Sequence, residues 1–191
     1  MPSIDEATAF RRASEGFVER ARKIGQAQWS AATPCTEWTV RALVNHVAGE
    51  YLWVPEMVAG RTIAEVGDHL DGDVLGDDPL QTLISARGAA LAAIDAPEAL
   101  GATVHLSFGD LPAREYVKQM ALDSVIHSWD LAHGIGGDDA LDPELVELCH
   151  AGLKDTAEDW RSAGAFGPEK APSDDSTQAK LLALTGRVDP T

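Results

Sequence analysis

Apolar residues recur at helical spacing through most of the chain. Five segments carry such a stripe, and each begins near a Ser, Thr, Asp or Pro start signal. Strand-like alternation of polar and apolar residues is confined to residues 103–108, which favours one short extended segment. The pattern predicts an all-α protein built on a four-helix bundle. The predicted bundle helices are residues 4–25, 39–58, 79–95 and 112–133, followed by a fifth helix at 143–163.

Several residues are expected to start or stop these helices. Ser3 and Glu6 have the spacing of a capping box, and Thr39 is the expected N-cap of the second helix. Pro55 lacks an N–H, so the second helix should kink or end near it. Gly134 is the expected C-terminal stop of the fourth helix.

The remaining segments predict loops. Residues 60–78 are rich in Gly and Asp and have no steady period, which indicates an exposed acidic loop. Residues from about 165 to 191 read as an irregular tail with a last helical turn at 180–184. We expect a single domain over residues 1–191, with the fifth helix and the tail packed against the bundle.

The fourth predicted helix is apolar nearly all round, except for one polar line. Asp123, His127 and Asp130 lie on one face of it, because residues three and four apart are neighbours on a helix. A helix of this kind is usually buried, and an unpaired buried charge is costly. The polar side chains on this line therefore need either other side chains or a metal ion as partners. Taken alone, this helix favours an ion pair between Asp123 and His127 over a metal site.

Composition and charge narrow the classes of partner. The 191 residues carry a net charge of −16, which argues against nucleic acid and against anionic membranes as partners. Cys35 and Cys149 lie too far apart in sequence to suggest a disulfide framework, so a reducing cytoplasm is the expected compartment. We expect no secretory leader and no membrane span. The oligomeric state is open between a monomer and a homodimer.

The region around the second helix resembles a known family. The stretch from Pro34 to His46, PCTEWTVRALVNH, resembles the second-helix motif of DinB-like proteins. Within that group it is similar to the metal-binding domain of mycothiol-dependent maleylpyruvate isomerases. Residues 123–132, DSVIHSWDLA, match that domain's second metal motif, and residues 181–187 resemble the ending of a small stand-alone subfamily. The resemblance thus touches both metal motifs and the C-terminal region.

This resemblance implies a set of metal ligands. Carried over residue by residue, they are His46, Asp123 and His127, with Asp123 where the isomerase has a glutamate. The shorter Asp side chain implies a metal nearer the helix or an extra water. Asp130 is a candidate acceptor for an imidazole N–H, with a salt bridge to an arginine as the equal alternative. Glu50, four residues after His46, is a rival for either role.

Two imidazoles and one carboxylate suit Zn²⁺ with one position open, and Ni(II) or Fe(II) are further candidates. An open Zn²⁺ site can bind and deprotonate a thiol. The resemblance implies that this small-molecule thiol is mycothiol, which would attack an electrophilic substrate. The expected function is therefore a metal- and thiol-dependent transferase or isomerase. The isomerase also has a C-terminal domain, which we do not expect within these 191 residues.

Two other functions are open from the sequence. One is a non-catalytic metal-binding module that senses or holds a ligand, and the other is a hydrolase that uses metal-bound water. Within the first motif, we expect Cys35 to be an inert packed thiol and Trp38 to belong to the core or to a pocket wall. His133 and the remaining histidines are expected to be ordinary polar residues.

Overall fold

The computed structural model describes residues 4–188, and these residues divide into two compact units, 4–139 and 140–188. Ser3, the first half of the expected capping box, lies outside the described residues. The expectation of one domain over residues 1–191, with the last helices packed on the bundle, stays a prediction. Within residues 4–188, no helix combines the length and the apolar character needed to cross a bilayer.

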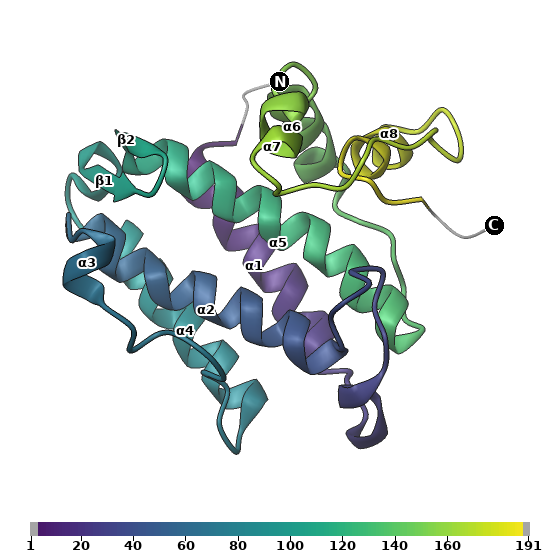
Figure 1. The fold of residues 1–191 in the computed structure, drawn as a ribbon, viewed down its shortest axis with the longest axis horizontal. Helices are drawn as coiled ribbons and strands as arrows, with labels where there is room; N and C mark the ends of the chain where they lie inside the picture. The colour runs from purple at the N-terminus through teal and green to yellow at the C-terminus, as the bar shows by residue number, and fades with distance from the viewer. Residues whose placement is uncertain (1–3, 189–191) are drawn as a thin grey trace. The chain divides into compact units, whose positions relative to one another are not determined.

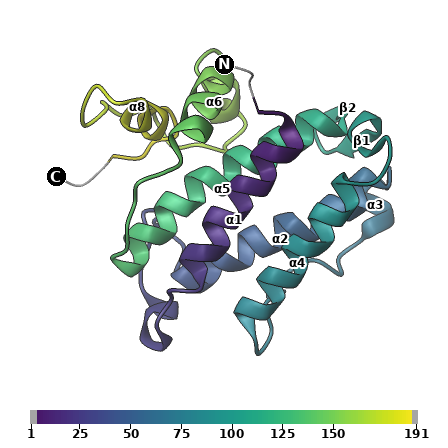
Figure 2. The same ribbon diagram turned by 180° about the vertical axis from the view of Figure 1, so that it is seen from behind.

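The first unit contains a four-helix bundle, which confirms the predicted all-α fold. Helix α1 packs against α5 and α4, and α2 packs against α4 and α5, so that each helix has two neighbours (Figures 1 and 2). The apolar stripes meet inside this ring, where Phe10, Phe17 and Tyr51 are buried. The bundle helices are α1 (Glu6–Ala21), α2 (Val40–Val58), α4 (Pro79–Ile94) and α5 (Ala113–Ile135).

Helices α2, α4 and α5 start within one residue of their predicted positions. Helix α1 starts at Glu6 instead of residue 4, so Glu6 is not the third helical residue that the expected capping box requires. Thr39 is the N-cap of α2 and accepts a hydrogen bond from the Ala42 N–H. Asp78 caps α4 in the same way, with Pro79 as the first helical residue. The N-cap of α1 is Asp5, and this helix ends four residues earlier than expected, before a short 3₁₀ helix η1 (Gln26–Ser30).

The predicted end of α2 is right and that of α5 is wrong. Helix α2 ends at Val58, as its predicted range has it, and contains Pro55 in its last turn. Helix α5 continues past Gly134 and stops at Gly136, whose φ of 64° lies in the left-handed region. Gly134 has a packing role instead. A Cβ atom there would lie 2.9 Å from the Val40 side chain, so a larger residue would collide with the start of α2.

The connections carry more structure than the sequence predicts. The acidic loop contains a one-turn helix α3 (Ile63–Val66), closed by a capping box of Thr62 and Glu65. The expected strand is β1 (Thr103–Leu106), and it follows a 3₁₀ turn η2 (Ala99–Gly101). It pairs antiparallel with an unpredicted strand β2 (Gly109–Pro112).

The second unit contains three helices, of which α6 packs against α8. The predicted single helix at 143–163 is broken, because the Thr156 hydroxyl bonds the carbonyls of Gly152 and Leu153 and so competes with continuation of the helix. The predicted turn at 180–184 is part of an eight-residue helix. These helices are α6 (Pro143–Leu153), α7 (Ala157–Ser162) and α8 (Thr177–Leu184).

Candidate metal centre

Three side chains predicted as ligands converge between α2 and α5. His46 comes from α2, and Asp123 and His127 come from successive turns of α5, with one ligand atom of each within 4.8 Å of the others. Asp123 Oδ1 lies 3.3 Å from His127 Nε2 and 3.6 Å from His46 Nε2. These separations exceed the usual hydrogen-bond range of about 2.7–3.2 Å. They match the edge of about 3.4 Å between tetrahedral ligands that lie about 2.0–2.1 Å from Zn²⁺.

The second carboxylate oxygen of Asp123, Oδ2, is buried and has no hydrogen-bond partner within the described residues. Buried carboxylate oxygens are normally satisfied, because desolvation of an unpaired one is costly. Two imidazole nitrogens beside a carboxylate with an unused oxygen form a donor set that fits a divalent metal.

Asp130 fixes the orientation of the His127 ring. Nδ1 of His127 donates to Asp130 Oδ2 over 2.8 Å, and Asp130 is completely buried. With the proton on Nδ1, the Nε2 lone pair faces Asp123 and His46. Carboxylate–histidine pairs of this kind orient the imidazole that binds a metal.

Cys35 reaches the same carboxylate from the loop before α2. Its thiol donates a hydrogen bond to Asp130 Oδ2 over 3.2 Å. The same oxygen accepts the hydrogen bond from His127 Nδ1. The three side chains of Cys35, His127 and Asp130 form a second convergent group that shares His127 with the first. No sequence pattern predicts this contact, because it depends on how the loop folds back onto α5.

Trp38 covers the two imidazoles, as expected for a wall of the site. Its ring centroid lies 4.7 Å from that of His46 and 5.7 Å from that of His127. The loop that carries it is held by the Thr33 hydroxyl, which donates to the Trp38 carbonyl over 2.9 Å. The half-buried indole therefore shields one side of the imidazole pair from water.

The electrostatics of the trio favour a charged carboxylate. Burial alone would raise the pKa of Asp123, but the neighbouring His127 and His46 outweigh it and hold that pKa well below its usual range. Burial likewise disfavours protonation of His127, yet Asp123 and the hydrogen bond to Asp130 hold its pKa well above the ordinary value. In the metal-free protein, the charged form of His127 thus substitutes for a cation beside Asp123.

Glu50 lies near the trio but outside both convergent groups. Burial, and then the charge of Asp123, raise the pKa of Glu50 to about 7, partly offset by His46 and His127. Burial also raises the pKa of Tyr116, with Glu50 and Asp123 adding to the effect. The structure therefore gives less support to Glu50 as a metal ligand than to His46, Asp123 and His127.

The other histidines of the first unit have local partners. His69 bonds the Val66 carbonyl, His105 bonds Asp110, and His133 bonds Asp139. Among residues 4–188, every convergent group of three or more potential metal ligands includes His127.

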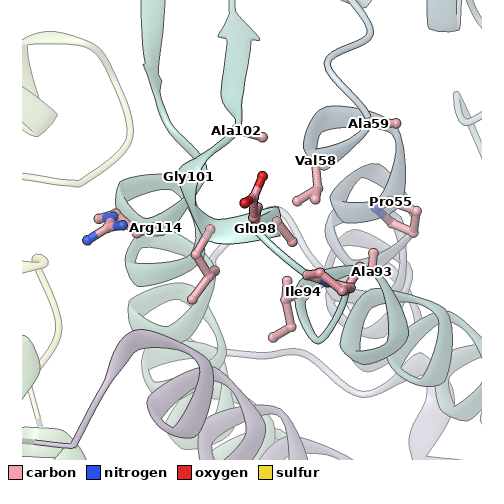
Figure 3. Close-up of a pocket in the computed structure, with 13 residues that line it drawn as sticks. Pro55, Val58, Ala59, Ala93, Ile94, Glu98, Gly101, Ala102 and Arg114 are labelled. Atoms are coloured by element: carbon pink, nitrogen blue, oxygen red, sulfur yellow. The ribbon is translucent and has the colours of Figure 1, made fainter.

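A cavity of about 1010 Å³ lies at the other end of the bundle (Figure 3). The ends of α2 and α4 and the start of α5 line it, with Pro55, Glu98 and Arg114 among its residues. Pro55 follows His46 by nine positions, or about 14 Å along a helix. The metal trio does not line this cavity.

Comparison with known proteins identifies the family. Residues 10–132 match the family described as the mycothiol maleylpyruvate isomerase N-terminal domain. Uncharacterized proteins from Mycobacterium tuberculosis strains CDC 1551 / Oshkosh and ATCC 25618 / H37Rv are each 30% identical over 192 residues, covering 97% of this chain and 99% of theirs.

A solved structure has a similar fold. It is the crystal structure of a histidine-to-alanine mutant of the mycothiol-dependent maleylpyruvate isomerase. The TM-score is 0.64 at 16% identity, over 88% of this chain and 75% of that one. The sequence match over most of the bundle, together with this fold, shows that the chain belongs to the mycothiol maleylpyruvate isomerase N-terminal domain family.

Proposed function

We propose that this protein is a metal-dependent transferase or isomerase that uses mycothiol as its nucleophile. The observation that carries the proposal is the convergence of His46, Asp123 and His127 around an unpaired buried carboxylate oxygen. Membership of the family supports mycothiol as the thiol. Both described cysteines are free thiols, which fits a reducing cytoplasm as the place of the reaction.

Zinc is the ion that this ligand set suits best, and Ni(II) and Fe(II) are compatible with it. A divalent ion held by these residues would lower the pKa of a thiol that coordinates it. The protein residues supply the rest of the arrangement. Asp123 contributes one negative charge, Asp130 holds the His127 ring in one orientation, and Trp38 excludes water from one side.

Metal analysis is the first test. Protein purified without chelator or histidine tag should contain about one divalent ion per chain. His127→Ala should lose the ion, because it removes one ligand of three. His133→Ala is the matched control on the same helix, since His133 bonds Asp139 away from the trio, and it should keep the ion. Equal metal content in His127→Ala and the parent protein would reject the ligand assignment.

Thiol binding is the second test. Mycothiol added to the Co²⁺ form should produce a sulfur-to-metal charge-transfer band and release a proton. Should mycothiol and simpler thiols all leave the cobalt spectrum unchanged, the thiol-dependent function is wrong. A metal-bound water for hydrolysis, or a purely structural metal, would then explain the site better.

A further inference from the structure

The two ring nitrogens of His127 face two different groups of side chains. Nε2 lies 3.3 Å from Asp123 Oδ1 in the trio, whereas Nδ1 lies 2.8 Å from Asp130 Oδ2. Cys35 Sγ lies 3.2 Å from that same oxygen of Asp130. One potential ligand atom from each of Cys35, His127 and Asp130 thus lies within 4.8 Å of the other two. The proposed function uses this second group only to orient the His127 ring.

A sulfur, an imidazole nitrogen and a carboxylate oxygen form a donor set that suits a zinc-like ion. With metal distances of about 2.0 Å to nitrogen and oxygen and about 2.3 Å to sulfur, a tetrahedral site has an N···O edge of about 3.3 Å and an S···O edge of about 3.5 Å. The observed edges of 2.8 and 3.2 Å are hydrogen bonds, because the N–H and S–H protons both point at Asp130 Oδ2. An ion that replaced these two protons would have to widen each edge by no more than about 0.5 Å.

The loop before α2 holds Cys35 beside the other two ligands and leaves it within reach of solvent. The Cys35 carbonyl accepts hydrogen bonds from the Trp38 N–H over 2.7 Å and from the Thr33 hydroxyl over 3.2 Å. The Cys35 side chain is half-buried, and the loop residues on both sides of it are exposed. Cys149, in contrast, is buried and belongs to neither convergent group. An ion can therefore reach Cys35 from the surface.

The charges of the two groups balance when each group holds a divalent ion. With ions on both ring nitrogens, His127 loses its Nδ1 proton and bridges the ions as an imidazolate. Asp123, Asp130, the Cys35 thiolate and this imidazolate then carry one negative charge each, which matches the charge of two divalent ions. A balanced and coordinated cluster avoids the desolvation cost that unpaired buried charges impose. The S–H and Nδ1–H protons leave to the solvent as the second ion enters.

We propose that Cys35, Asp130 and His127 form a second metal site, which takes a thiophilic divalent ion such as Cd²⁺, or Zn²⁺ in excess, on the Nδ1 side of the His127 ring. Thiolate sulfur favours soft ions, and imidazole nitrogen is compatible with them. The second ion has to displace two protons and break two hydrogen bonds, so the trio fills first and the purified protein holds one ion. This inference goes beyond the proposed function, because it requires no thiol-dependent reaction.

A cadmium titration tests the second site. Metal-free protein is loaded with one equivalent of Zn²⁺ and titrated with Cd²⁺, while ultraviolet absorption follows sulfur-to-cadmium charge transfer and metal analysis after desalting counts the ions. The parent protein should develop the band, with an endpoint near one Cd²⁺ per chain, and hold two ions in total. Cys35→Ser should show no band and hold one ion, because serine keeps a donor for Asp130 but has no sulfur. Cys149→Ala, which removes the other thiol, is the matched control and should behave as the parent does.

Three results would overturn the inference: no band in the parent, a band of equal size in Cys35→Ser, or a band that appears only as zinc is lost, which would mean that the two sites exclude each other. Circular dichroism checks that Cys35→Ser is folded. Should it be unfolded, cadmium NMR of Cys149→Ala decides, because Cys35 is then the one thiol of the chain and a sulfur ligand moves the resonance strongly downfield. Failure of Zn²⁺ to bind the parent would reject the trio, whereas a cadmium band that depends on Cys35 would still support the second site.

Discussion

Replacing Glu50 by glutamine should stabilise the metal-free protein at high pH and leave it unchanged at low pH. Folding raises the pKa of this carboxyl from 4.5 to about 7, chiefly through burial. Below the unfolded value both states are protonated, and the side chain imposes no penalty. As pH rises through the folded value, the unfolded chain has already ionised and the folded state becomes relatively less stable.

The size of the effect follows from these two values. At about 1.4 kcal/mol per pKa unit, the full penalty above pH 7 is about 3 kcal/mol. Glutamine has nearly the same shape and carries no charge, so Glu50→Gln should recover most of that free energy. The variant should be about equal to the parent below about pH 4.5, and its advantage should grow between about pH 5 and 8.

Urea unfolding followed by circular dichroism, in the presence of chelator, measures this difference at each pH. Glu56→Gln on the same helix is the control and should keep the parent's pH dependence. Added zinc should shrink the advantage of Glu50→Gln, because a nearby dication favours the carboxylate. A difference between variant and parent that stays constant from low to high pH would refute the reasoning.

Three further predictions concern the metal and the packing around it. Chelator should lower the melting temperature of the parent but not of His127→Ala, since metal at a hundredfold excess over its dissociation constant contributes about 2.7 kcal/mol; an equal fall in both would count against the site. Asp130→Asn should weaken metal affinity by about 10–100-fold in a competition assay with a chelating dye, and unchanged affinity would show that its hydrogen bond to His127 has no influence. Gly134→Ala should cost about 1–3 kcal/mol in urea unfolding, because the new Cβ would lie 2.9 Å from Val40. Gly88→Ala, in a helix interior with open space at this position, should instead gain up to about 1 kcal/mol, and similar effects at both glycines would contradict this account.

Local signals in the sequence predict where helices begin better than where they end. Thr39 caps α2 as expected, because a capping side chain bonds N–H groups two or three residues away. The end of α5 depended on choosing between Gly134 and Gly136. Only the folded structure distinguishes these two glycines. At Gly134 the missing side chain leaves room for the Val40 side chain, whereas Gly136 has a left-handed backbone conformation that ends the helix. Strand β2 was missed because four residues carry too little pattern to read.

For the candidate site too, the sequence predicts contacts within one helix better than contacts between segments that are distant in sequence. The face shared by Asp123 and His127 follows from helical spacing alone. The approach of His46 does not, because it lies more than seventy positions earlier on another helix, and only the family resemblance indicated it. The contact of Cys35 with Asp130 depends on packing between segments distant in sequence.

The pairing of the first and last bundle helices has a consequence for synthesis on the ribosome. Helix α1 packs against α5, yet about ninety residues separate the end of one from the start of the other. At about 5–20 residues per second, the nascent chain spends roughly 5–20 s with the apolar side of α1 uncovered. His46 emerges during that interval without its partners. A metal bound by the trio, as proposed, would therefore be acquired late, after α5 has left the ribosome and closed the bundle.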